Sequence, residues 1–263
     1  MTKMVNHRVD DSQYSLIKII TIWAVVSVPM PILAYIIAPI LAPNGGINYG
    51  LTVWILMIAG MIWQFIVSMW ILYRELETFT WGAIKERIWL QKPQNPNTGA
   101  FSYKFLWWLI PAFLFYFGTE MTSIAELTGN LILIPFPQID DLPKLDLKEL
   151  MLPELFGAWW LMAMAVISCI FNYFLGEELL FRGILLPKMR GAFGKWDWAA
   201  NSALFALYHM HRPTQALGFI LGGFALSFPS RHFKSIWFAI ILHGFEGIFV
   251  LVSVFAVVTG LAF

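Results

Sequence analysis

The 263-residue chain carries little charge. Only 13% of its residues are Asp, Glu, Lys or Arg, whereas 59% are hydrophobic and 17% are aromatic. Soluble domains have about 25% charged and about 45–50% apolar residues. The shortage of charge therefore excludes an ordinary water-soluble enzyme, and the aromatic content excludes a disordered chain. The composition predicts an all-α fold, a polytopic transmembrane helix bundle.

Cysteine and net charge are scarce as well. The one cysteine, Cys169, lies in an apolar run, which excludes an intrachain disulfide and a zinc site built from thiolates. The formal net charge of +1 gives no electrostatic reason to expect nucleic acid as a partner. The apolar stretch that follows Tyr14 shows no small-residue cleavage pattern, so we expect it to remain in the protein as a membrane span.

Long apolar stretches predict seven or eight membrane spans. A helix needs about 20 mostly apolar residues to cross about 30 Å of hydrocarbon. Stretches of this kind lie at about residues 17–41, 51–73, 105 onward, 155–189, 196–210, 215–228 and 236–263. The last one is long enough for one helix, or for a helix and a short second piece. Residues 130–137 are too few to span, and we expect them to be interfacial or re-entrant.

The distribution of Lys and Arg predicts the orientation in the membrane. Basic residues concentrate before the first span and in segments 74–104, 188–195 and 231–234, whereas the loop after the third span is acidic. The N-terminus is therefore expected in the cytoplasm and the C-terminus outside. Residues 1–104 would hold the N-terminal spans and a cytoplasmic linker, and residues 105–263 the transmembrane helical core, within one membrane domain overall.

Six ionisable side chains remain inside the predicted spans: Glu177, Glu178, Arg182, His209, His243 and Glu246. A charge at the centre of a spanning helix costs about 2.5–3.5 kcal/mol, so such groups usually pair or line a functional cavity. At about 1.5 Å per residue, Glu177, His209 and His243 lie about 16, 18 and 13 Å from the cytoplasmic face. We therefore expect these three side chains to meet at one level.

Local spacing distinguishes the two adjacent glutamates. Glu178 and Arg182 are four residues apart on a helix, which favours an ion pair on one face. Glu177 lies about 100° around the helix and is left without that partner. His209 is a suitable partner, and together they would take a proton from a water that attacks a carbonyl. Three other polar residues, Asn172, Asn201 and Tyr208, are weaker candidates for lining the same cavity.

These residues form motifs in a recognisable order. The run E-E-L-L-F-R at 177–182, the run F-A-L-Y-H at 205–209 and the later His243 resemble the CPBP family. This family comprises the CAAX prenyl proteases and the bacteriocin-processing or immunity proteins. Its pattern is EExxxR, then FxxxH, then a His followed four residues later by Asn or Asp. The resemblance covers about residues 155–247.

The resemblance implies an intramembrane endopeptidase of the glutamate type, formerly classed as a metalloprotease. Glu177 and His209 would activate water, and His243 would stabilise the oxyanion. Glu178 and Arg182 would brace the site. The substrate would be a membrane-associated peptide or a prenylated protein C-terminus. No metal is expected, although Glu177 and the two histidines could instead hold a divalent ion.

One position departs from the family pattern. Four residues after His243 the chain has Gly247 in place of Asn or Asp, and Glu246 lies one position earlier. An ionised carboxylate cannot donate to an oxyanion, but Glu246 could hold His243 in one tautomer. This departure keeps open a second hypothesis, a non-catalytic immunity or scaffold protein.

A proton-coupled transporter is the third hypothesis, and the absence of two paired halves in the sequence argues against it. The oligomeric state has no signature in the sequence.

Overall fold

The computed structural model describes residues 13–121, 129, 131, 135 and 150–261. The structure is 79% helical. No strand occurs in the described part, where an isolated bridge joins Gln94 and Phe101. The predicted all-α class is therefore confirmed. The predicted interfacial segment 130–137 and most of the acidic loop after it lie outside the described residues, apart from Leu131 and Pro135.

The helices follow one another along the chain with short breaks. The α-helices are α1 (Leu16–Ser27), α2 (Pro29–Ile32), α3 (Ala38–Leu41), α4 (Gly46–Glu75), α5 (Trp81–Arg87), α6 (Leu109–Met121), α8 (Trp159–Ile170), α9 (Arg190–Phe193), α10 (Asp197–Tyr208), α11 (Ala216–His232) and α12 (Trp237–Thr259). Three wider π-helical segments are η1 (Leu33–Ile37), η6 (Phe171–Leu175) and η7 (Leu179–Leu185). Short 3₁₀ turns are η2 (Tyr103–Trp108), η5 (Pro153–Leu155), η8 (Leu186–Lys188), η9 (Gly194–Trp196) and η10 (Pro213–Gln215).

Four helical stretches in the described part are long and apolar enough to cross a membrane. They are Leu16–Leu41, Gly46–Glu75, Trp159–Lys188 and Trp237–Thr259. The first of them continues past three prolines through the π turn η1. Helices α10 and α11 have 12 and 17 residues, so they measure about 18 and 26 Å and fall short of about 30 Å of hydrocarbon. The predicted seven or eight spans are not confirmed.

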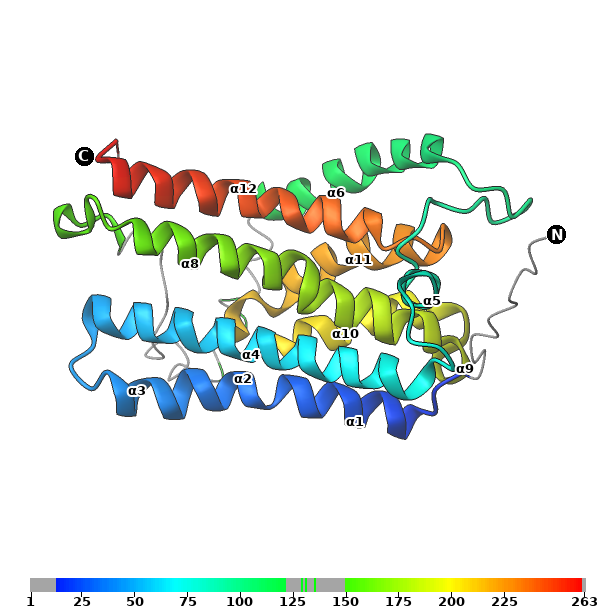
Figure 1. The fold of residues 1–263 in the computed structure, drawn as a ribbon, viewed down its shortest axis with the longest axis horizontal. Coiled ribbons are helices and arrows are strands. Elements are labelled where there is room, and N and C mark those ends of the chain that lie inside the picture. Colours follow the sequence, from blue (N-terminus) through cyan, green and yellow to red (C-terminus); the bar gives the residue numbers. More distant parts are fainter. Residues whose placement is uncertain (1–12, 122–128, 130, 132–134, 136–149, 262–263) are drawn as a thin grey trace.

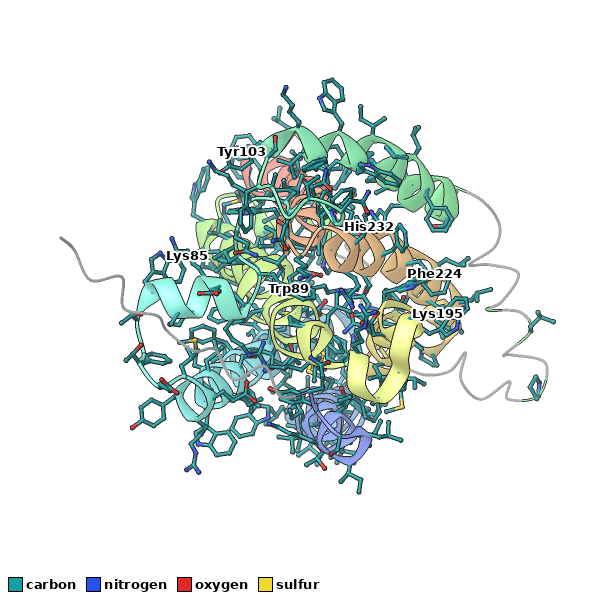
Figure 2. All side chains as sticks on the ribbon, turned by 90° about the vertical axis from the view of Figure 1, so that its right-hand side faces the viewer. Lys85, Trp89, Tyr103, Lys195, Phe224 and His232 are labelled. Carbon is teal, nitrogen blue, oxygen red and sulfur yellow. The ribbon has the colours of Figure 1, made fainter. Side chains whose placement is uncertain are left out.

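The long helices lie side by side along the length of the molecule (Figure 1). Helix α12 packs against α8, and the short α10 and α11 pack against each other between the long helices. Helix α6 lies against α11 and α12. Helix α1 begins at one end of the bundle and α12 finishes at the other (Figure 1). An end-on view shows Lys85 and Lys195 at the end where α1 begins (Figure 2).

One hydrophobic cluster joins the N-terminal helices to the segment that carries the EExxxR motif. Ile19 and Leu72 share this cluster with Leu180, Phe181 and Leu242, and all five are fully buried. In the same region the Trp23 indole donates to the Leu204 carbonyl at 2.8 Å, which ties α1 to α10. Residues 176–186, which carry the motif, are buried throughout, as a membrane-spanning segment needs when it contains charges.

A buried arginine fastens one end of this helix. The Arg87 guanidinium donates to Glu75 and to the Tyr14 hydroxyl, both at 2.9 Å. It also donates to the carbonyls of Gly183 and Ile184 at 3.2 Å. Burial raises the pKa of Tyr14 well above its usual value, so the phenol keeps its proton and donates to Glu75. Arg87 thus couples α4 and α5 to η7, the segment that contains Arg182.

Replacing Arg87 by Met should lower the free energy of unfolding by about 3–5 kcal/mol, because Glu75 and two carbonyls lose a buried partner. Lys18 pairs with the same carboxylate at 2.9 Å, but 48% of its side chain is exposed. Lys18→Met should therefore cost less than about 1 kcal/mol. Unfolding in detergent micelles followed by circular dichroism measures both. Equal losses in the two variants would show that Arg87 does not hold this end of the helix.

Candidate active site

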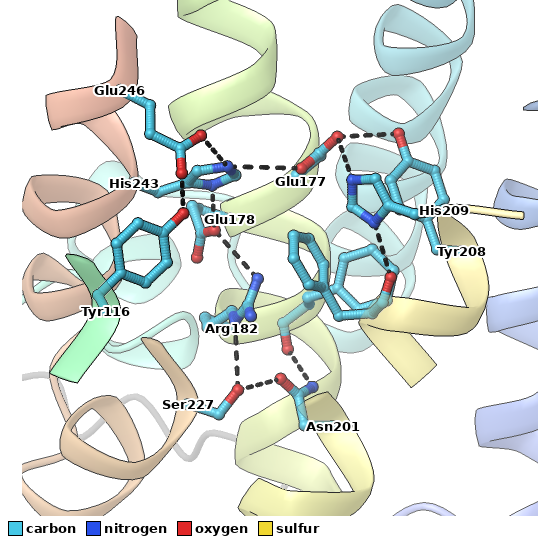
Figure 3. A network of polar contacts seen from close by, with 12 residues as sticks. Tyr116, Glu177, Glu178, Arg182, Asn201, Tyr208, His209, Ser227, His243 and Glu246 are labelled. Atoms are coloured by element: carbon cyan, nitrogen blue, oxygen red, sulfur yellow. Dashed lines mark hydrogen bonds and ion pairs between the residues drawn. The ribbon is translucent and has the colours of Figure 1, made fainter. Parts of the chain in front are cut away.

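The structure gathers the six residues singled out in the sequence into one polar site inside the bundle (Figure 3). Glu177 and Glu178 lie between η6 and η7, His209 directly follows α10, and His243 lies in α12. Oε1 of Glu177 is 3.9 Å from Nε2 of His209, and Oε2 is 4.0 Å from Nε2 of His243. The expectation that these three side chains meet at one level is confirmed.

Glu178 pairs with Arg182 as their spacing predicts. Its Oε1 accepts from Arg182 Nη1 at 3.0 Å, and neither side chain is exposed. The same oxygen lies 2.8 Å from Nδ1 of His243. The contact that fixes the His243 ring therefore comes from Glu178, whereas Glu246, the residue considered for this role from the sequence, lies 3.8 Å from Nε2.

A second row of contacts holds Arg182 in place. Its Nε lies 3.4 Å from the Ser227 hydroxyl, which donates to Oδ1 of Asn201 at 2.9 Å. The Asn201 amide in turn donates to the Phe181 carbonyl at 2.8 Å. The Phe205 ring lies under the guanidinium, with 4.1 Å between Cζ and the ring centroid, a distance at which a cation is attracted by an aromatic face. This row connects η7 to α10 and α11.

The F-A-L-Y-H motif sets the orientation of His209. The Phe205 carbonyl lies 2.9 Å from Nδ1 of His209. Because a carbonyl oxygen only accepts, Nδ1 carries the proton in this contact, and Nε2 of the neutral ring is left as an acceptor. This acceptor faces Glu177 across a gap too long for a direct hydrogen bond. The adjacent Tyr208 hydroxyl donates to Oε1 of Glu177 at 3.0 Å.

A π turn before the motif brings Asn172 to the same carboxylate. With its amide nitrogen facing Glu177, Asn172 donates to both carboxylate oxygens, at 2.8 and 3.2 Å. In an α-helix residues 172 and 177 would lie about 140° apart around the axis. The Gly176 N–H instead bonds the Phe171 carbonyl five residues back, at 2.7 Å, and this wider turn brings Asn172 to the side of Glu177.

Glu246 occupies the more open edge of the site. Its side chain is 36% exposed. The hydroxyl of Tyr116, which lies in α6, donates to its Oε1. The sequence motifs did not predict that Tyr116 belongs to the site, because α6 and α12 meet only in the folded bundle.

No group of three or more His, Cys, Asp or Glu side chains in the described part of the chain is arranged to hold a metal ion. The expectation that the protein works without a metal stays a prediction.

The π turn requires a glycine at position 176. A Cβ there would lie 2.6 Å from the Phe171 carbonyl oxygen and 3.1 Å from that of Met61. Gly176→Ala should therefore lower the free energy of unfolding by about 1–3 kcal/mol through overpacking. At Gly244, in α12, a Cβ meets nothing within 4 Å, so Gly244→Ala should be neutral or raise stability by up to about 1 kcal/mol. Denaturation of both variants in micelles tests this, and a tolerated Gly176→Ala contradicts it.

Comparison with known proteins places these residues in a family. Residues 157–261 match the model of the Rce1-like family, described as type II CAAX prenyl endopeptidase Rce1-like. No curated protein and no solved structure matches the chain. The matched segment runs from just before α8 to just after α12 and includes Glu177, His209 and His243. The C-terminal part of this chain therefore matches an Rce1-like domain, which supports a membrane protease of the CPBP family.

Proposed function

We propose that this protein is an intramembrane endopeptidase that hydrolyses a peptide bond with a water molecule activated by Glu177 and His209. The observation that carries the proposal is a buried carboxylate with two imidazoles 3.9 and 4.0 Å from its oxygens. Arg182, the nearby cation, is paired with Glu178. Glu177 is thus free to exchange a proton, which a carboxylate held in an ion pair is not.

The gap between Glu177 and His209 fits a water molecule that both residues contact. The water would donate one hydrogen bond to Glu177 and the other to the unprotonated Nε2 of His209. As its oxygen forms a bond to the substrate carbonyl carbon, one proton moves to Glu177. That proton then passes to the leaving amine while the C–N bond breaks, and Glu177 is regenerated. The hydrogen bonds from Asn172 and Tyr208 keep the carboxylate oriented through both transfers.

His243 is placed to receive the negative charge of the tetrahedral intermediate. Its Nδ1 is held by Glu178 at 2.8 Å, while Nε2 faces the space between Glu177 and Glu246. In the doubly protonated form of this imidazole, Nε2–H is a donor toward that space. A preorganised donor in a dry site is among the largest contributions to such reactions.

The substrate is proposed to be a membrane-associated peptide or a prenylated protein C-terminus, with no organic cofactor and no metal. The family match supports this substrate class. We also propose that the bundle end with Lys85 and Lys195 (Figure 2) faces the cytoplasm, following the positive-inside rule. Helix α1 begins at this end and α12 finishes at the opposite end (Figure 1). The C-terminus would then lie outside. The shorter helices would complete seven or eight membrane segments.

Cleavage of quenched farnesylated and unmodified peptides by the purified protein in liposomes tests the proposal. Glu177→Gln and His209→Gln should each lower kcat/KM by about 10²–10⁴, the usual contribution of a positioned acid–base group. Glu86→Gln, at an exposed position in α5, is the matched control and should cleave at the wild-type rate. A chelator should leave cleavage unchanged.

Three outcomes would oppose the proposal. Unchanged cleavage in both site variants would remove the roles of Glu177 and His209. Loss of cleavage with chelator, restored by a divalent ion, would assign the chemistry to a metal. A wild-type protein that cleaves nothing, while another Rce1-like protease is active in the same liposomes, would favour a non-catalytic immunity or scaffold function.

A further inference from the structure

The side of the site next to His243 contains an unassigned aromatic residue. Gly247 lies one helical turn after His243 in α12, and a Cβ built on it would be 2.7 Å from Cε2 and 2.8 Å from Cδ2 of Tyr173. The Tyr173 ring therefore fills the space that a side chain at position 247 would take. Tyr173 belongs to the π turn η6 and is only 8% exposed. The ring fits there because residue 247 is a glycine and has no side chain.

The ring of Tyr173 meets the imidazole of His243 edge to face. Their centroids are 4.8 Å apart and the planes are inclined by 83°. The carboxylates of Glu246 and Glu177 act electrostatically on this phenol. The hydroxyl of Tyr173 thus belongs to the same polar site as Nε2 of His243.

The Tyr173 hydroxyl has a neutral acceptor on the preceding residue. When the Asn172 amide nitrogen donates to Glu177, the amide oxygen of Asn172 is left to accept a hydrogen bond. A bond to an oxyanion is roughly twice as strong as a bond to a neutral acceptor, and a hydroxyl proton turns freely to the better acceptor. The other two tyrosines of the site already donate to carboxylates, Tyr116 to Glu246 and Tyr208 to Glu177.

We propose that Tyr173 is the second oxyanion donor of this protein, acting beside Nε2–H of His243. The inference rests on the proposed hydrolysis and identifies a catalytic residue for it. In the resting site the Tyr173 hydroxyl donates to Asn172. As water adds to the carbonyl carbon, the hydroxyl turns to the developing oxyanion, and it returns to Asn172 when the C–N bond breaks. Gly247 takes part only by leaving room for the ring.

Tyr173→Phe is the direct test, because it keeps the ring and removes only the hydroxyl. The variant should lose about 10²–10³ in kcat, the usual cost of one oxyanion donor, with KM and the unfolding midpoint unchanged. Tyr49→Phe is the matched control. Tyr49 is also a buried tyrosine, and its hydroxyl donates to the Ala34 carbonyl at 3.0 Å. Its removal should leave kcat unchanged. A wild-type kcat in Tyr173→Phe would overturn the proposal.

A position swap separates the hydroxyl from the packing of the ring. Gly247→Asn alone should lose activity because its side chain meets the Tyr173 ring. In the double variant Tyr173→Ala/Gly247→Asn, the ring is gone and an amide donor occupies the vacated space. This double variant should exceed Tyr173→Ala at least tenfold in kcat. A double variant no better than Tyr173→Ala would count against a donor at this place.

Binding of a peptide phosphonate, which carries the charge of the tetrahedral intermediate, tests Tyr173 without turnover. Tyr173→Phe should bind it at least tenfold more weakly than wild type while binding the matching amide peptide equally well. Equal phosphonate affinity in both proteins contradicts the donor role. If the wild type cleaves no peptide, the proposed function fails, whereas the phosphonate comparison still decides the role of Tyr173.

Discussion

The buried ion pair between Glu178 and Arg182 is the interaction on which the rest of the site depends. Both side chains are fully excluded from solvent, and breaking a buried pair costs about 3–5 kcal/mol because one charge is left uncompensated. The pair satisfies one of the two adjacent glutamates, Glu178, and leaves Glu177 for the proposed chemistry. Both partners make further contacts. Glu178 contacts His243, and Arg182 contacts Ser227 and the Phe205 ring. One ion pair thereby sets the positions of three helices around Glu177.

The backbone adapts to this arrangement. The helix that carries both glutamates leaves α geometry before the motif, in η6, and again after it, in η7. π turns are rare and occur frequently at functional sites. Here the first turn directs Asn172 toward Glu177 and Tyr173 toward His243, so a single local distortion supplies two polar groups. The N-terminal region supports the same helix from the other end, where Arg87 binds the carbonyls of Gly183 and Ile184.

Sequence spacing predicted which of the motif residues come together. The pairing of Glu178 with Arg182 follows from four-residue periodicity, and the common level of Glu177, His209 and His243 follows from counting residues from the basic loops. The contacts of Asn172 and Tyr173 depend on a π turn, which apolar periodicity does not reveal. Tyr116 depends on how α6 packs against α12, a long-range contact with no local sequence signal. The number of spans stays a prediction, because α10 and α11 are apolar but too short to cross a bilayer on their own.

In the proposed mechanism Glu177 delivers water to the substrate and does not attack the substrate itself. Cleavage in ¹⁸O-labelled water, with protein in excess over peptide and products read by mass spectrometry, tests this most directly. Water activation predicts that the new C-terminal carboxylate of the product carries the label in the first turnover and that Glu177 stays unlabelled. A first-turnover product without label, or label in the peptide that contains Glu177, would show that the glutamate is a nucleophile and would contradict the account.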